Sequence, residues 1–249
     1  MGREDALPVG PVGIVTGGLK GIGAASAVEF GRLGARLVLV ARSLAGGEAL
    51  VEQVRAAGGE ALLESIDVRD PAAQERVARR ALDEWGRIDF LVANAGVADQ
   101  SRVAEGDPER WRTVVETNLL GVMYSCRAVL PAMLEQGSGH ILIMSSVSGR
   151  ESYVGEPVYI ATKWGQVGFA HALRLELLEA GIRVTIVEPG LVDTPLTRDN
   201  PKIRPLLDAI EPLTAEDVAR AVVYAYQQPE RVAVSEIVVR PQHQVLPEL

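Results

Sequence analysis

The chain has 249 residues, a net charge of −8 and one cysteine, Cys126. Because no basic block is present to neutralise phosphates, the charge argues against a nucleic-acid-binding protein. A lone cysteine cannot form an internal disulfide, and Cys126 lies in an apolar stretch typical of a buried thiol. No signal peptide and no apolar span of about 20 residues is found, so we expect a cytoplasmic protein that does not enter a membrane.

Short apolar runs alternate with longer amphipathic stretches along the whole chain. We interpret as strands the runs 12–15, 36–41, 61–66, 88–92, 140–144, 182–187 and 234–239. We interpret as helices the stretches 24–33, 45–57, 71–85, 108–135, 158–180 and 215–227. This alternation predicts an α/β fold, a doubly wound parallel sheet of about seven strands with helices on both faces. We expect one domain over residues 1–249, with flexible tails at 1–10 and 241–249.

A glycine-rich segment, Thr16-Gly17-Gly18-Leu19-Lys20-Gly21-Ile22-Gly23, lies between the first predicted strand and the first predicted helix. Glycines let backbone N–H groups approach a phosphate closely, and the start of a helix favours negative charge. A glycine cluster alone also fits a simple tight turn. The strand before it and the helix after it favour a dinucleotide-binding loop.

Tyr159 and Lys163 are four residues apart in a predicted helix and therefore share one of its faces. A nearby ammonium favours the phenolate and moves the tyrosine pKa from its usual value of about 10 toward the working range of an acid or base. Ser146 follows the strand 140–144 and presents a hydroxyl where that strand stops. Alone, the same spacing also fits two solvated residues on an exposed face.

Together these motifs resemble the short-chain dehydrogenase/reductase family, from about Val12 to about Pro241. The family's glycine pattern falls on Thr16, Gly17, Gly21 and Gly23, and its Asn-Ala-Gly motif on Asn94-Ala95-Gly96. Its active-site tetrad falls on Asn118, Ser146, Tyr159 and Lys163, and its later Pro-Gly motif on Pro189-Gly190, followed by Thr194. No position of this core pattern is missing.

The resemblance implies a Rossmann-like fold, a homodimer or homotetramer, and hydride transfer between a nicotinamide and a small carbonyl or alcohol substrate. It implies that Tyr159 is the general acid/base, that Lys163 lowers the tyrosine pKa, and that Ser146 binds the substrate oxygen. Asn118 is expected to support a water linked to Lys163, and Thr194 to contact the carboxamide. The expected cofactor-binding residues are Thr16, Gly17, Lys20, Gly21, Ile22, Gly23, Arg42, Asp67, Val68, Asn94, Ala95, Gly96, Tyr159, Lys163, Pro189, Gly190, Val192 and Thr194.

Charge indicates which dinucleotide is preferred. A site for NAD usually carries a carboxylate after the second strand, but this strand ends in Ala41-Arg42-Ser43. Arg42 could hold a 2′-phosphate, and Lys20 lies at a position in the glycine segment that is often basic in NADP-dependent relatives. These two could also be ordinary surface cations, but together with the missing acid they favour NADP(H) over NAD(H). Asp67-Val68 resembles the pair that lies against the adenine in this family.

The substrate is less constrained by the sequence. Residues 191–213 are the expected substrate-binding lid, in which Arg198, Lys202 and Arg204 could recognise an acidic substrate or lie on a solvated face. The main alternative function is a 3-oxoacyl-thioester reductase of lipid synthesis, and a less favoured one is a non-catalytic dinucleotide-binding sensor. No metal site is expected, because the three histidines have no second ligand at metal spacing.

Overall fold

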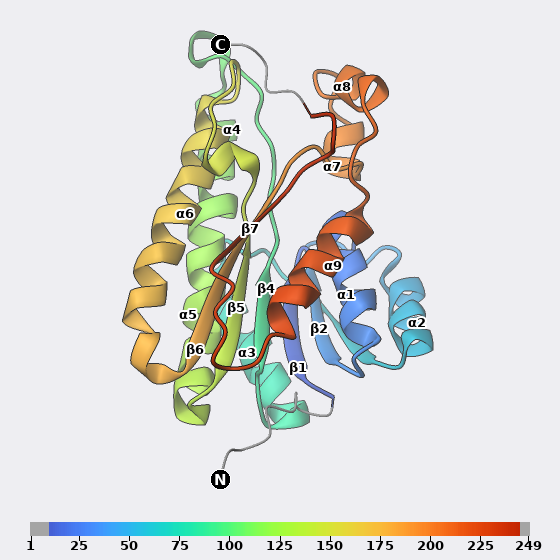
Figure 1. Cartoon of the computed structure of the whole chain (residues 1–249), viewed down its shortest axis with the longest axis vertical. Coiled ribbons are helices and arrows are strands. Elements are labelled where there is room, and N and C mark those ends of the chain that lie inside the picture. The colour runs from blue at the N-terminus through green and yellow to red at the C-terminus, as the bar shows by residue number, and fades with distance from the viewer. Residues whose placement is uncertain (1–9, 245–249) are drawn as a thin grey trace.

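The computed structural model describes residues 10–244, and within them seven strands form one parallel sheet. The strand order is β3-β2-β1-β4-β5-β6-β7 (Figure 1). Strands β1 to β3 are therefore added toward one edge of the sheet and β4 to β7 toward the other, so the strand order reverses between β1 and β4. The predicted doubly wound parallel sheet is thereby confirmed, and each predicted strand is present. The strands are β1 (Val12–Thr16), β2 (Arg36–Ala41), β3 (Glu60–Ser65), β4 (Phe90–Ala93), β5 (Gly139–Met144), β6 (Ile182–Pro189) and β7 (Glu236–Val239).

Helices cover both faces of the sheet (Figure 1). One layer holds α1 (Gly21–Gly31), α2 (Gly47–Ala57) and α9 (Ala215–Tyr226). The opposite layer holds α3 (Pro71–Trp85), α5 (Gly121–Gln136) and α6 (Pro157–Glu176). The start of α3 shows how the sequence sets a helix boundary: the Asp70 carboxylate accepts hydrogen bonds from the N–H groups of Ala72 and Ala73, and Pro71 occupies the first helical position.

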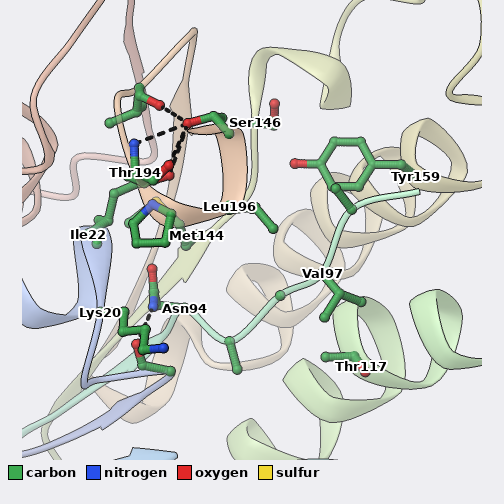
Figure 2. Close-up of a pocket in the computed structure, with 18 of the residues that line it drawn as sticks. Lys20, Ile22, Asn94, Val97, Thr117, Met144, Ser146, Tyr159, Thr194 and Leu196 are labelled. Atoms are coloured by element: carbon green, nitrogen blue, oxygen red, sulfur yellow. Dashed lines mark hydrogen bonds between the residues drawn. The ribbon is translucent and has the colours of Figure 1, made fainter. Parts of the chain in front are cut away.

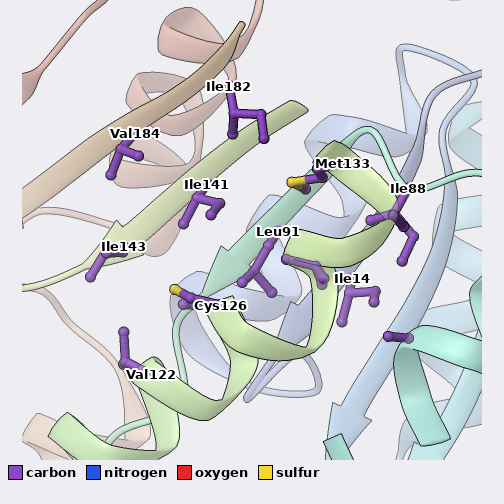
Figure 3. Packing of buried hydrophobic residues seen from close by; sticks show 14 of the residues in the cluster. Ile14, Ile88, Leu91, Val122, Cys126, Met133, Ile141, Ile143, Ile182 and Val184 are labelled. Carbon is purple, nitrogen blue, oxygen red and sulfur yellow. The ribbon is translucent and has the colours of Figure 1, made fainter. Parts of the chain in front are cut away.

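The core is mostly aliphatic, as the composition predicts. Figure 3 shows Leu91 and Ile141, from neighbouring strands, facing Val122, Cys126 and Met133 of α5. All five side chains are at most 3% exposed. This packing fixes the second layer of helices, which carries Tyr159 and Lys163, against the sheet.

Three aromatic side chains form a cluster on the other face. The rings of Phe30 in α1 and Phe90 in β4 stack with centroids 4.0 Å apart. Tyr226 of α9 meets them at 5.3 and 5.0 Å. These contacts fix α1, which follows the glycine segment, in one position over the sheet.

The stretch 108–135, expected as one helix, is interrupted. It consists of α4 (Pro108–Val115), a π-helical segment (Glu116–Leu120) and α5. A π segment adds a residue to one turn, a feature frequent at functional sites. Here it contains Asn118, which is fully buried.

The predicted lid and both ends of the described chain contain defined local structure. The lid contains two short helices, α7 (Pro195–Arg198) and α8 (Arg204–Ala209). Short 3₁₀ turns span Val103–Glu105, Val147–Gly149 and Leu178–Ala180. Of the predicted tails, residues 1–9 and 245–249 lie outside the described residues. The remainder is tied down: the carbonyl of Gly10 accepts hydrogen bonds from Arg36, and the side-chain oxygen of Gln244 accepts one from the N–H of Leu191 at 2.9 Å.

Candidate active site

A cavity of about 880 Å³ opens beyond the carboxyl ends of β1, β4 and β5, where the strand order reverses. Ligands of doubly wound sheets bind at this position. Thr16, Gly23 and Asn118 do not line the cavity and lie behind its wall. The other predicted site residues all line it, namely Gly17, Lys20, Gly21, Ile22, Arg42, Asp67, Val68, Asn94, Ala95, Gly96, Ser146, Tyr159, Lys163, Pro189, Gly190, Val192 and Thr194.

The glycine segment packs so closely against the loop after β4 that two positions require glycine. A Cβ on Gly17, whose φ is +62°, would lie 2.9 Å from the Cα of Ala95. A Cβ on Gly23 would lie 2.3 Å from the carbonyl oxygen of Gly17. The segment therefore forms a narrow cradle of backbone at the start of α1.

Thr16 and Asn94 hold this cradle in place. The Thr16 hydroxyl accepts hydrogen bonds from the N–H groups of Asn94 at 3.1 Å and Ala95 at 3.2 Å. The Asn94 amide returns two hydrogen bonds, to the carbonyls of Thr16 and Gly17, both at 3.1 Å. The side chains of these two residues thus link the turn after β1 to the turn after β4.

Tyr159 and Lys163 lie side by side on α6, as the spacing predicts. The Nζ atom of Lys163 is 5.5 Å from the centroid of the Tyr159 ring. Figure 2 shows the Tyr159 ring entering the cavity from α6, across from Ile22 and Asn94. Lys163 is only 5% exposed, and burial lowers its pKa to about 7.

The pKa of Tyr159 shifts in the direction opposite to the one that a neighbouring ammonium alone would give. Burial raises it, the Ser146 hydroxyl opposes that rise, and the negative charge of Glu156 adds to it. Ser146 begins the turn Val147–Gly149, and its Oγ accepts a hydrogen bond from the N–H of Ser148 at 3.1 Å. The geometry therefore keeps the proton on the Tyr159 phenol at neutral pH.

Asn118 acts through both its side chain and its backbone. Its amide clamps the loop after β4, since Oδ1 accepts from the N–H of Val97 and Nδ2 donates to the carbonyl of Val97, both at 2.8 Å. Its backbone carbonyl accepts a hydrogen bond from Nε2 of Gln166 at 2.5 Å. Asn118, expected to support a water linked to Lys163, is therefore connected to Lys163 through the side chain of Gln166.

The opposite end of the cavity is cationic. Arg42 and Lys20 are exposed and form no ion pair with any residue of the described range 10–244. Asp67 is paired with Arg69 at 2.6 Å, and that hydrogen bond lowers the pKa of its carboxyl, with a smaller contribution from the charge of Arg42. Two unpaired cations at one end of a long cavity fit an anionic group.

Sequence reasoning did not single out Gln166 or Gln100. Gln166 is fully buried beside Lys163, and its position three residues later on the same helical face was the available indication. Gln100 lines the cavity, and its amide donates to Glu156 at 3.1 Å. Nothing in the local pattern of residues 97–100 indicates that contact.

Two further observations limit the kind of site. Among residues 10–244, no group of three or more His, Cys, Asp and Glu side chains is placed to hold a metal ion. No helix in that same range has the length and apolar character needed to cross a bilayer.

A glycine cradle at the switch point of a doubly wound parallel sheet is the arrangement of dinucleotide-binding proteins. The profile of the short chain dehydrogenase family matches residues 11–204. The chain therefore belongs to this family, and it is an oxidoreductase of that family.

Individual relatives agree with this assignment. An uncharacterized oxidoreductase of Staphylococcus saprophyticus is 36% identical over 231 residues, which cover 92% of this chain and 97% of that protein. The crystal structure of a metagenomic short-chain oxidoreductase in complex with NADP is 33% identical, with a TM-score of 0.81, over 95% of this chain and 99% of that one. An alcohol dehydrogenase from Thermococcus sibiricus, complexed with 5-hydroxy-NADP, is 28% identical, with a TM-score of 0.85, over 96% and 99%.

Proposed function

We propose that the protein is an NADP(H)-dependent oxidoreductase that interconverts a carbonyl and an alcohol on a small substrate, with Tyr159 as the general acid/base. The observation that carries the proposal is the position of the Tyr159 phenol, which enters the cavity from α6 with Lys163 beside it. Ser146 lines the same part of the cavity and interacts with the phenol.

The residues fit a bound dinucleotide. The backbone cradle at Gly17 and Gly23 leaves no room for side chains, as required where a pyrophosphate approaches a helix start. Arg42 and Lys20 would hold a 2′-phosphate at one end, while Lys163 would contact the nicotinamide ribose at the other. The NADP complex of the metagenomic relative supports the same preference.

When bound, the nicotinamide supplies the hydride for reduction or accepts it in oxidation. In reduction, the Ser146 hydroxyl donates a hydrogen bond to the carbonyl oxygen and holds it near the phenol. Tyr159 then transfers its proton to that oxygen, which becomes the alcohol hydroxyl. Because burial raises the pKa of Tyr159, the phenol is protonated at neutral pH, as reduction requires. The Lys163 ammonium stabilises the phenolate that remains.

The test is NADPH and NADH oxidation by the purified protein over a panel of aldehydes, ketones, diketones and oxo-acids, with Tyr159→Phe measured beside it. We expect turnover with an NADPH preference, a loss of at least about 10³-fold in Tyr159→Phe, and unchanged NADPH affinity. Full activity in Tyr159→Phe would exclude the phenol as the acid. A coenzyme-A-linked ketoester belongs in the panel, because its preferential reduction would favour the thioester reductase. Tight NADPH binding without turnover of any compound would favour the sensor.

We further propose a single-domain cytoplasmic protein that assembles as a homodimer or homotetramer. Apolar side chains on and just after α6 support the assembly, since Trp164, Leu175 and Leu178 are 50%, 76% and 72% exposed. Size-exclusion chromatography with light scattering tests it, and a monomer at micromolar concentration would contradict it.

A further inference from the structure

Gln166 joins two members of the predicted catalytic tetrad. It lies on α6 and is fully buried. Its Oε1 accepts a hydrogen bond from Nζ of Lys163 at 3.1 Å, and its Nε2 donates to the backbone carbonyl of Asn118 at 2.5 Å. One side-chain amide therefore connects the ammonium to the π-helical segment.

The complete burial of the Gln166 amide restricts the role that it can have. A buried amide is costly unless both its donor and its acceptor find partners. Within residues 10–244, the acceptor and donor of the Gln166 amide find their partners at Lys163 and Asn118. An apolar side chain would fill the same space without that requirement, so the amide has a specific function at this position.

The contacts of Lys163 indicate what that function is. An ammonium has three N–H donors. One is directed to the carbonyl of Met144 at 2.9 Å and a second to Gln166 at 3.1 Å. The third is left for the cavity, which Lys163 lines next to Tyr159.

The chemistry of an amide adds a second consequence. Its oxygen only accepts hydrogen bonds and its nitrogen only donates them, so it orients its partners without passing a proton between them. The connection from Lys163 through Gln166 to Asn118 is therefore a fixed anchor.

We infer that Gln166 is a positioning residue, which anchors the Lys163 ammonium to the backbone of Asn118 and directs its remaining N–H into the cavity. The inference rests on the proposed function for its catalytic consequence, but the anchor itself is a property of the folded protein. Loss of the Oε1 acceptor removes a carbonyl that favours the charged lysine. Less ammonium at neutral pH means less stabilisation of the Tyr159 phenolate.

Three variants of the full chain test this. Gln166→Met keeps the length of the side chain without an acceptor, and Gln166→Glu keeps the acceptor and adds a negative charge. Gln136→Met is the matched control, since the Gln136 amide also bridges two groups, the N–H and carbonyl of Ile88, both at 2.8 Å, but it bonds neither Lys163 nor Asn118. The pKa of Lys163 is measured by NMR of ¹³C-labelled protein. The pH dependence of kcat is measured for alcohol oxidation with NADP⁺.

We expect the Lys163 pKa to fall by about one unit in Gln166→Met and to rise in Gln166→Glu. We expect kcat of Gln166→Met to fall roughly 10- to 100-fold, with little change in NADPH affinity. The ascending limb of its pH profile, which reports formation of the Tyr159 phenolate, should move to higher pH. Gln136→Met should leave the Lys163 pKa and the pH profile unchanged. A wild-type Lys163 pKa and pH profile in Gln166→Met would overturn the inference and leave Gln166 a packing residue.

If Gln166→Met does not fold, the test rests on Gln166→Glu. A Lys163 pKa in Gln166→Glu that is no higher than in the wild type would then overturn the inference. If the wild-type protein turns over no substrate while the Lys163 pKa responds as expected, the anchor stands and the proposed function fails.

Discussion

Gly23 is the position at which one added methyl group should weaken both cofactor binding and the stability of the fold. Its Cβ would lie 2.3 Å from the carbonyl oxygen of Gly17 and 2.7 Å from Nδ2 of Asn94. These two atoms are themselves hydrogen-bonded at 3.1 Å. Gly23→Ala must therefore displace the glycine segment, and cannot be accommodated by a side-chain rotation alone.

The magnitude follows from the bonds that the displacement breaks. Leaving a buried donor or acceptor unsatisfied costs about 1–3 kcal/mol, against a gain of about 0.5–1 kcal/mol when glycine becomes alanine in a helix. With Asn94 and Gly17 separated, we expect a net loss of about 2 kcal/mol. For a chain of this size that lowers Tm by roughly 4–8 °C. Moving backbone N–H groups away from a phosphate should weaken NADPH binding at least about tenfold.

Gly168→Ala provides the matched control. Gly168 lies within α6 and is exposed, and a Cβ there would meet nothing within 4 Å. The same substitution should raise Tm by roughly 1–4 °C and leave NADPH affinity unchanged. Differential scanning fluorimetry and nicotinamide fluorescence titration give the two values. A Gly23→Ala protein with wild-type Tm and NADPH affinity would refute the steric argument.

Three other substitutions or conditions test separate parts of the structure. Arg42→Ala should raise the Kd for NADPH roughly 10- to 100-fold and that for NADH less than about threefold, by fluorescence titration; equal losses would contradict a 2′-phosphate contact. Between pH 7 and 5 the urea midpoint should fall, because burial lowers the pKa of His140 well below its usual value and only the unfolded chain gains that proton. His140→Asn should reduce the change of the urea midpoint with pH, and an unchanged pH dependence would count against the role of His140. Burial raises the pKa of the Cys126 thiol to about 12, so a disulfide reagent should label it only on unfolding, and rapid labelling of folded protein would disprove this.

The sheet could be predicted because each strand has a local cause. Runs such as Arg36–Ala41 are apolar, short and bounded by glycine or polar turns, and they alternate with amphipathic stretches. Parallel strands that are buried on both faces produce such continuous apolar runs, which can be identified from the sequence alone. The Tyr159–Lys163 pair was also predictable, because helical spacing is sufficient to place both side chains on one face.

The π-helical segment Glu116–Leu120 could not be predicted in the same way. One extra residue in a single turn scarcely changes the amphipathic pattern of 108–135, so the interruption at Asn118 is decided by packing. The pKa direction of Tyr159 has a similar origin. Spacing indicates a nearby cation, but the extent of burial, which raises the pKa, depends on the whole fold.

Gln166 was missed because its significance is a long-range property. In the sequence it is one polar residue of a helix and would ordinarily face solvent. Its buried position results from the approach of the π-helical segment, 48 residues earlier in the chain. The local sequence indicates only its spacing from Lys163 and not its burial.

The contact between Gln244 and Leu191 joins the last described turn of the chain to the first residue of the lid. This contact requires glycine at position 190, because a Cβ there would lie 2.1 Å from the side-chain oxygen of Gln244. A truncation that removes Gln244, or a purification tag that displaces it, would therefore release the first residue of the predicted lid without changing any member of the predicted catalytic tetrad. Gly10 precedes β1 and is not among the residues that line the cavity. Expression vectors for these experiments should accordingly carry their tag at the N-terminus.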